Sequence, residues 1–282
     1  MDHRSPYAPG AVLTAADVAG LVDHALLKPE LTPQDVLGAL DGLSEAGVWS
    51  VCVRPGDVAD VAAHLREAGS GTRVCTVIGF PHGSTSTTAK VAESRQALED
   101  GATELDMVLA IGRLRGGDHD RVRDDIAAVV EVAHTQDRIL KVILETSLLS
   151  DEQKETGCRL AAEAGADFVK TSTGFHPSGG ASPRAVELMA GAVDGRLGVK
   201  ASGGIRSAAD AIAMLDAGAT RLGLSGTRAV LDGLNNVDRS AGAALASIGE
   251  LGDSLETATG GANAAARDAS KQLGESVPAI NA

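Results

Sequence analysis

A closed barrel of eight parallel strands, each followed by a helix, is the fold that this sequence predicts for residues 1–236. Short apolar runs alternate there with longer amphipathic segments, and such alternation favours a parallel sheet covered by helices. Eight of these runs fall within roughly 235 residues, which matches the strand number and the usual length of a (β/α)8 TIM barrel. An open doubly wound sheet is the alternative. It is disfavoured because no Gly-x-Gly-x-x-Gly segment follows the first run.

The predicted strands are short runs rich in Val, Leu and Ile. Runs of about four to eight apolar residues bounded by turn residues are typical of buried strands. The first run also fits the end of a helix, because it follows Leu21 without a break. The expected strands are residues 22–27, 48–53, 73–80, 104–111, 139–146, 167–171, 195–200 and 220–224.

The segments between these strands carry helix signals. Thr32 is an N-cap type of residue, and Pro33 fits the first helical turn after it. Several segments end in an alanine and a glycine just before the next strand, as at Ala46-Gly47 and Ala217-Gly218. Glycine there allows a left-handed C-cap. Further helices are expected at residues 91–99, 124–134, 153–164, 183–189 and 207–216.

Composition and charge argue against several kinds of partner. Acidic residues outnumber basic ones by 38 to 25, so the formal net charge is −13, and nonspecific binding to nucleic acid or to an anionic membrane is not expected. No apolar run reaches the length of about 18 residues that a membrane span needs. The N-terminus lacks the pattern of a signal peptide. Cys52, Cys75 and Cys158 show no metal-binding spacing, and their odd number fits reduced thiols. We therefore expect a cytoplasmic protein without a metal or a cofactor.

The last part of the chain differs in composition from the rest. From residue 237 it is rich in Ala, Gly and Ser. Residues 241–255 fit one helix, whereas residues 257–282 have little apolar periodicity and are expected to be mobile. The sequence thus predicts a single barrel domain, residues 1–236, and a partly helical or disordered tail, residues 237–282, without a catalytic role.

Two lysines end neighbouring predicted strands. Lys170 is followed by a Thr-Ser-Thr-Gly turn, and Lys200 by Ala-Ser-Gly-Gly. The C-terminal strand ends of such a barrel hold its active site, and adjacent backbones lie about 4.8 Å apart. Two ammonium groups at roughly 5–6 Å repel by about 3 kcal/mol, or about two pKa units, and burial acts in the same direction. One amine is therefore expected to be partly neutral and able to attack a carbonyl. A lone lysine at a strand end would more often be a surface charge.

Other polar residues lie within the predicted strands. Asp106 interrupts an apolar run and needs a partner, for which a lysine across the barrel is suitable. The pair fits proton transfer during imine formation or a structural ion pair. Lys141 and Glu145 share one face of their strand by its period of two, so Lys141 fits either the inner charges or a structural role. Asp23 and Cys52 fit either a pocket or an ordinary core.

Two glycine-rich turns follow the last two predicted strands. Residues 202–207 open a helix after the seventh strand, and residues 223–228 follow the eighth. Loops at these positions, with bare backbone amides and a helix N-terminus, form the usual phosphate site of such barrels, and Arg206 adds charge. The sequence therefore predicts a phosphate site beside the two lysines.

These segments resemble deoxyribose-phosphate aldolases. The likeness extends over residues 20–233 and is most specific in Lys170-Thr171-Ser172-Thr173-Gly174 and Lys200-Ala201-Ser202-Gly203-Gly204-Ile205-Arg206. The other matching segments are Asp23-His24-x-Leu26-Leu27-Lys28-Pro29 and residues 51–53, 76–83, 104–108, 141–146 and 221–225.

The resemblance implies a role for each matching residue. Lys170 is implied as the Schiff-base lysine, Lys200 as the lysine that lowers its pKa, and Asp106 as their acid/base partner. Asp23, Cys52 and Lys141 match positions around the pocket. Together with the turns described above, the resemblance assigns the phosphate cradle to Gly174, Gly203, Gly204, Ile205, Arg206, Gly223, Ser225 and Gly226.

The sequence also departs from the family at several places. Ala25 stands where the family often has a threonine, Phe175 replaces a lysine that some relatives use on phosphate, and Gly226 replaces a serine. Tyr7 is the only tyrosine, so the tail lacks the one that assists proton transfer in some relatives. The phosphate is therefore expected to be held more by backbone amides than by side chains.

The resemblance implies a class I aldolase, a carbon–carbon lyase that reversibly cleaves 2-deoxy-D-ribose 5-phosphate into D-glyceraldehyde 3-phosphate and acetaldehyde through a lysine Schiff base. Such an enzyme belongs to carbohydrate and deoxyribonucleotide catabolism. The alternatives are a class I aldolase for another phosphorylated sugar and a barrel that binds phosphorylated metabolites without catalysis. The expected partners are small phosphorylated sugars and aldehydes, without nucleic acid or membrane, and a homodimer is left open.

Overall fold

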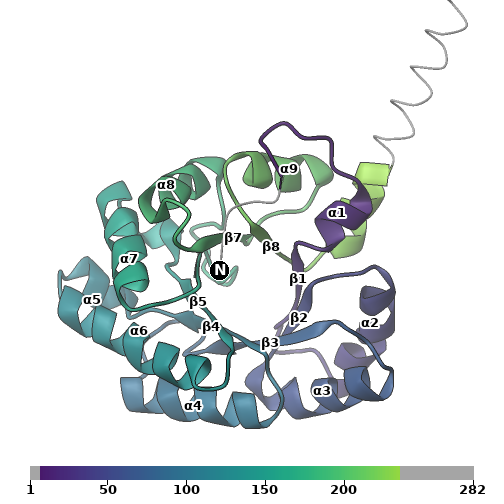
Figure 1. The fold of residues 1–282 in the computed structure, drawn as a ribbon, viewed down its shortest axis with the longest axis horizontal. Coiled ribbons are helices and arrows are strands. Elements are labelled where there is room, and N and C mark those ends of the chain that lie inside the picture. Colours follow the sequence, from purple (N-terminus) through teal and green to yellow (C-terminus); the bar gives the residue numbers. More distant parts are fainter. Residues whose placement is uncertain (1–6, 236–282) are drawn as a thin grey trace, which may run out of the picture. The chain divides into compact units, whose positions relative to one another are not determined.

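The computed structural model describes residues 7–235, and within them the strands close into a parallel barrel in the order β1-β2-β3-β4-β5-β6-β7-β8. In Figure 1 the strands form an inner ring and the helices surround it. The predicted (β/α)8 barrel is confirmed, and the open sheet is not formed. The tail predicted for residues 237–282 lies outside the described residues, as do residues 1–6.

Each strand of the described region is short and almost fully buried. The strands are β1 (Val22–Leu26), β2 (Ser50–Val53), β3 (Arg73–Ile78), β4 (Glu104–Val108), β5 (Ile139–Ile143), β6 (Phe168–Lys170), β7 (Gly198–Ser202) and β8 (Arg221–Leu224). Their order along the chain is their order around the barrel, so each strand pairs with its sequence neighbours, and β8 closes the ring on β1.

Helices follow the strands on the outside of the barrel. They include α1 (Ala15–Ala19), α2 (Pro33–Glu45), α3 (Val58–Glu67), α4 (Thr87–Glu99), α5 (Ile111–Arg115), α6 (His119–His134), α7 (Asp151–Glu163), α8 (Pro183–Val193) and α9 (Ala208–Asp216), together with the short 3-10 turns η1 (Pro55–Asp57) and η2 (Thr146–Leu148). The predicted start at Thr32 is confirmed, because its hydroxyl caps α2 and Asp35 completes a capping box. None of the helices within residues 7–235 is long and apolar enough to cross a membrane.

Several strand ends differ from the predicted ones. The run expected at 104–111 pairs only as far as Val108, and α5 begins at Ile111. The run expected at 195–200 enters the sheet only at Gly198, because Asp194 and Gly195 have φ of 47° and 69° and form the turn after α8. The apolar residues continue past the end of a strand in the sequence, whereas the hydrogen-bonded pairing stops where the neighbouring strand turns away. The predicted strands are therefore longer than the observed ones.

The two faces of the barrel strands carry different residues. Leu105 and Met107 face outward into the large apolar core that the helices cover. Glu104 and Asp106 alternate with them and are also buried, at 1% and 0% exposure. Because side chains of a strand alternate between its faces, the two acids share the inner face. The barrel interior therefore holds buried charges, which need partners.

Candidate active site

Lys170, Lys200 and Asp106 meet inside the barrel. Lys170 lies opposite Lys200 in the register of β6 and β7. Both ammonium groups donate to Oδ2 of Asp106, at 2.7 Å from Lys170 and 2.8 Å from Lys200. Lys170 is only 2% exposed and Lys200 1%. The structure thus brings the three predicted catalytic residues into direct contact.

A second layer of charges lies beside this group. Lys141 Nζ contacts Glu104 at 2.5 Å, Oδ1 of Asp106 at 2.9 Å and Asp23 at 3.5 Å. Asp23 also contacts Lys200 at 2.5 Å and Arg221 at 2.9 Å. Lys141, which fitted two roles in the sequence, therefore joins the inner charges. We call these residues the interior charge cluster: Asp23, Glu104, Asp106, Lys141, Lys170, Lys200 and Arg221.

Trp49 packs beside the cluster. Its indole nitrogen donates to Glu104 at 2.7 Å, and the guanidinium groups of Arg73 and Arg221 stack over its ring at 3.7 Å and 4.3 Å. An aromatic ring stabilises guanidinium groups that stack on it by cation–π attraction. The members of the cluster themselves are all buried. The charges of the cluster therefore interact in a medium of low dielectric constant, where their attraction is strong.

The cluster shifts the pKa values of its members. Burial alone would favour the neutral form of Lys200, but Asp106 and Asp23 outweigh it and raise the pKa of Lys200 above its ordinary value. Lys200 is therefore not the partly neutral amine that repulsion between the two lysines predicted. Burial likewise opposes ionisation of Asp106, yet the charges of Lys141, Lys170 and Lys200 hold its pKa well below the usual range. Burial also opposes the charge on Asp23, and Lys200, Lys141 and Arg221 lower its pKa in the same way.

Cys52 and Cys75 lie on the same inner face, paired in the register of β2 and β3. The Cys75 thiol donates to Asp106 at 3.3 Å, and a hydrogen bond from Cys75 lowers the pKa of Cys52. Burial raises the pKa of Cys75 well above its ordinary value. The two sulfur atoms and an Asp106 oxygen lie within 4.8 Å of one another, so their spacing would suit a metal ion. The donors do not fit one well, because Asp106 already binds three ammonium groups that repel a cation.

A cavity of about 280 Å³ opens between the loops that follow β6, β7, β8 and β1. All the predicted cradle residues except Gly226 line it. Gly223 in its lining lies against Lys200, because a Cβ at Gly223 would be 3.2 Å from the Lys200 side chain. Gly203 has φ of 89°, and a Cβ there would lie 3.1 Å from Gly180 Cα, so only glycine fits without strain. Lys28 and Arg206 are the cations of the lining. The cavity thus offers bare amides and two positive charges to an anion.

A larger cavity of about 660 Å³ lies at the mouth of the barrel on the other side of the Thr173–Phe175 turn. Its apolar walls are Pro81, Ile111, Leu148, Phe175 and Pro177, and its polar members are His82, Glu145, Thr173 and His176. Phe175 packs edge to face against Phe80 with ring centroids 5.1 Å apart. Thr173 and Phe175 line both cavities, so this turn separates them.

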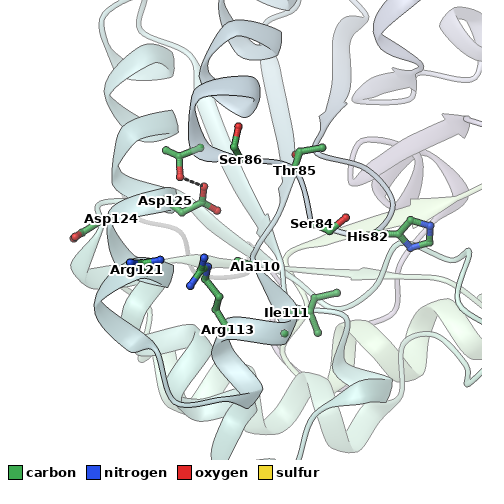
Figure 2. Close-up of a pocket in the computed structure, with 13 residues that line it drawn as sticks. His82, Ser84, Thr85, Ser86, Ala110, Ile111, Arg113, Arg121, Asp124 and Asp125 are labelled. Carbon is green, nitrogen blue, oxygen red and sulfur yellow. Dashed lines mark hydrogen bonds between the residues drawn. The ribbon is translucent and has the colours of Figure 1, made fainter.

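A third hollow, of about 770 Å³, lies outside the barrel between the β3–α4 loop, α5 and α6 (Figure 2). Its polar groups are largely engaged with one another. Asp125 accepts from the Thr87 hydroxyl at 2.8 Å and pairs with the buried Lys90 at 2.6 Å. Arg113 and Arg121 both contact Asp118, at 2.7 Å and 3.8 Å. The hollow shares His82 and Ile111 with the mouth cavity, but it holds none of the predicted site residues.

Sequence reasoning missed several residues of this site. Glu104 lies two positions before Asp106, so the strand period could have placed both on the inner face. Arg221 begins β8 and carried no such signal, because its partners come from β1 and β4. Glu145 was expected on the same strand face as Lys141. It lies instead beyond the end of β5 and binds Thr173, because φ of 59° turns the chain there.

A closed barrel with two buried lysines on adjacent strands, a shared carboxylate and an anion cavity defines a class of barrel enzymes that act on carbonyl compounds through a lysine. The chain matches the DeoC/LacD family of aldolases over residues 1–235, and it belongs to that family. The deoxyribose-phosphate aldolase of Mycolicibacterium paratuberculosis is 57% identical over 225 residues, which are 78% of this chain and 98% of the relative. The enzyme of the same name from Mycobacterium tuberculosis is 56% identical over 226 residues, which are 79% of this chain and 98% of the relative.

Solved structures agree with this assignment. The tetrameric deoxyribose phosphate aldolase of Aeropyrum pernix is 33% identical and superposes with a TM-score of 0.74, covering 79% of this chain and 93% of the other. An aldolase designated QR15 is 36% identical with a TM-score of 0.73, covering 80% of this chain and 98% of the other. The family match over residues 1–235 includes every strand that contributes to the interior charge cluster.

Proposed function

We propose that this chain is a deoxyribose-phosphate aldolase that cleaves 2-deoxy-D-ribose 5-phosphate to D-glyceraldehyde 3-phosphate and acetaldehyde, and that Lys170 forms the Schiff base. The observation that carries the proposal is the contact of Lys170 and Lys200 with one oxygen of Asp106, next to an anion cavity. The names of the relatives, which match almost their full length, support the same activity.

The anion cavity suits the phosphate of this substrate. The amides of Gly203 and Gly204 lie in the turn before α9, and Lys28 and Arg206 add two positive charges. Backbone amides at a helix N-terminus are favourable partners for phosphate. With the phosphate bound there, the other end of the sugar extends toward the barrel interior and Lys170. The cavity thereby serves to orient the aldehyde carbon over the amine.

The charge balance of the cluster favours Lys170 as the nucleophile. Four cations face three carboxylates in the interior charge cluster, so the loss of one proton removes a surplus positive charge. Within residues 7–235, Lys170 has one carboxylate contact, to Asp106, whereas Lys200 has two and Lys141 has three. Deprotonation of Lys170 therefore breaks the fewest ion pairs, and the neutral amine can attack a carbonyl.

The steps that follow use the same groups. Attack on the aldehyde gives a carbinolamine, and loss of water gives an iminium ion. The iminium accepts the electrons of the breaking C2–C3 bond when the C3 hydroxyl loses its proton, so D-glyceraldehyde 3-phosphate leaves and an enamine remains. Protonation of the enamine and hydrolysis release acetaldehyde. Asp106, with Lys200 and a water molecule, moves these protons, because its carboxylate contacts both amines.

Borohydride trapping tests the proposal. The protein is incubated with 2-deoxy-D-ribose 5-phosphate, reduced, digested and analysed by mass spectrometry, with Lys170→Met as the matched protein without the amine. We expect one reduced adduct, on the peptide that contains Lys170, and none in the variant. An adduct on another residue overturns the mechanism. Faster turnover of another phosphorylated sugar overturns the substrate, and binding without any adduct favours a non-catalytic barrel.

Location and assembly are proposals as well. We infer a cytoplasmic protein, and the three free, buried cysteines support this because reduced thiols persist there. Fractionation of cells that express the chain tests it.

We keep a homodimer as the proposed assembly. Sedimentation at several concentrations distinguishes it from a tetramer like that of the Aeropyrum pernix enzyme.

A further inference from the structure

We propose that Glu145 forms a hydroxyl-binding subsite at the mouth of the barrel, where its Oε1 accepts a hydrogen bond from a hydroxyl group next to the carbonyl of the acceptor aldehyde. The acceptor aldehyde is the one to which the enamine adds in the synthetic direction. The inference rests on the proposed aldolase activity and names a group that recognises its substrate.

Only one of the two carboxyl oxygens of Glu145 is hydrogen-bonded. Oε2 accepts from the backbone nitrogen of Thr173 at 3.2 Å and from the Thr173 hydroxyl at 2.5 Å. Oε1 is buried and has no hydrogen-bond partner, and no cation pairs with Glu145 in the described part of the chain. A buried carboxyl oxygen without a partner is costly. A ligand hydroxyl would remove that cost.

The other buried polar atoms without hydrogen bonds have simpler explanations. Oδ2 of Asp23 lies 2.5 Å from Lys200 and 3.5 Å from Lys141, so ion pairs satisfy it. Ser147 is only half-buried, and a hydroxyl can rotate toward solvent. Among residues 7–235, Glu145 is therefore the buried polar side chain that the fold itself leaves unexplained.

The backbone holds Glu145 in a fixed place relative to Lys170. Glu145 has φ of 59° and ψ of 63°, a left-handed conformation that persists in a non-glycine residue only where its surroundings impose it. The amide of Leu144 donates to the Lys170 carbonyl, and the amide of Thr146 to the Thr171 carbonyl, both at 2.9 Å. The residues on either side of Glu145 are thus tied to the strand end that carries the proposed nucleophile.

The mouth cavity defines the chemistry of the ligand. Glu145 lines it together with apolar walls, and the cavity adjoins the phosphate cavity across the Thr173–Phe175 turn. A carboxyl oxygen that lacks a partner accepts a hydrogen bond, so the ligand has to present a donor there. The apolar walls of the cavity disfavour a charged ligand. A small aldehyde with a hydroxyl on the carbon next to its carbonyl, and with an otherwise apolar body, fits these constraints. This is the class of acceptor that the subsite would take.

Two acceptors test the subsite, with acetaldehyde as the donor in both reactions. 2-Hydroxypropanal and 2-methylpropanal differ only by a hydroxyl in place of a methyl group. Because the hydroxyl would satisfy a buried acceptor that otherwise has no partner, we expect the wild-type kcat/KM to favour the hydroxylated acceptor by about tenfold to a hundredfold. A wild-type protein without this preference overturns the inference, and no variant is needed to decide it.

The variant Glu145→Gln separates the two oxygens. Its amide oxygen can keep the contacts of Oε2 with Thr173, while its NH2 group replaces the accepting Oε1 by a donor. We expect the preference for 2-hydroxypropanal to fall about tenfold or more. The control is Thr173→Val, which removes the hydroxyl bound by Oε2 and leaves Oε1 in place. It should lower both rates and keep their ratio.

The outcomes distinguish the subsite from the activity. Wild-type protein that forms no borohydride adduct with acetaldehyde overturns the aldolase proposal, and the inference fails with it. Wild-type protein that forms the adduct on Lys170, together with a Glu145→Gln variant that keeps the full preference, overturns the inference alone. A ratio that falls equally in Glu145→Gln and Thr173→Val also overturns it, because Glu145 would then act only by holding the turn.

Discussion

Lys170 lies directly opposite Lys200 in the register of two adjacent strands, and the two ammonium groups donate to the same oxygen of Asp106. Their mutual repulsion is therefore offset by a carboxylate between them. The consequence differs for the two lysines. Lys200 is held by Asp23 as well, whereas Asp106 is the single carboxylate contact of Lys170 in residues 7–235. This asymmetry supports the proposal that Lys170 is the nucleophile, while Lys200, whose pKa is raised, stays protonated and can donate a proton.

Replacement of Lys200 by leucine should abolish most turnover. The change leaves Asp23 and Asp106 with one fewer cation in a buried place, so we expect a loss of stability of about 3–5 kcal/mol. Because a positioned proton donor contributes at least about a hundredfold, kcat should fall by that factor or more. Steady-state kinetics and urea unfolding measure the two effects.

Lys154→Leu is the matched control for this change. Lys154 pairs with Asp151 at 2.8 Å on the surface of α7, where Asp151 is exposed. An exposed pair contributes less than about 1 kcal/mol, so this variant should retain its stability and its kcat. A Lys200→Leu protein with the kinetics of Lys154→Leu would contradict the role assigned to Lys200.

Stability should fall between pH 6.5 and pH 4 because of His24. Burial lowers the pKa of His24 from 6.5 to about 4. The unfolded chain therefore binds a proton near pH 6.5, whereas the folded protein does so only near pH 4, and stability rises with pH across this window. The contribution is complete above pH 6.5 and amounts to about 3 kcal/mol. Urea unfolding at several pH values measures it.

His24→Asn removes the titration without removing the polar group. The Nδ1 atom of His24 lies 2.8 Å from the Thr227 hydroxyl, and an asparagine side chain can replace that contact. The variant should show a flatter dependence of stability on pH in this window. Folding lowers the pKa values of Asp23 and Asp106, so their contributions to stability are lost as the pH falls through and below the ordinary aspartate value of 3.8, which lies below this window. An unchanged slope in His24→Asn would refute the assignment.

Gly203→Ala should weaken binding of the phosphorylated substrate. The new Cβ would meet Gly180 Cα at 3.1 Å and Gly174 Cα at 3.3 Å, on a backbone with φ of 89°. The turn has to move, so we expect KM for 2-deoxy-D-ribose 5-phosphate to rise by about tenfold, the equivalent of about 1.4 kcal/mol. KM for unphosphorylated 2-deoxyribose should change much less. Gly226→Ala is the control, because nothing lies within 4 Å of its Cβ and Gly226 does not line the cavity. Equal effects in the two variants would argue against the cradle.

Local patterns predicted the barrel well but not its strand ends. The eight apolar runs and the alanine–glycine turns repeat along the chain, so they indicated both the number and the order of the strands. Where each strand stops depends on its neighbour. Gly198 begins β7 because its amide donates to the Asp167 carbonyl beside β6. The residues next to Gly198 in the sequence do not indicate this distant partner.

The sequence by itself determined the fold, the two lysines and the glycine turns, because strand period and turn chemistry are local properties and the motifs are contiguous. Only the tertiary structure decided how the charges pair. Glu104 and Arg221 belong to the cluster, whereas Glu145, which was expected on the same strand face as Lys141, binds Thr173 instead. The physical reason is that closure of the barrel brings β1, β4, β5, β6, β7 and β8 to one interior. A charge that is buried there needs a partner of opposite charge close by in space, and the linear sequence does not show which residues are close.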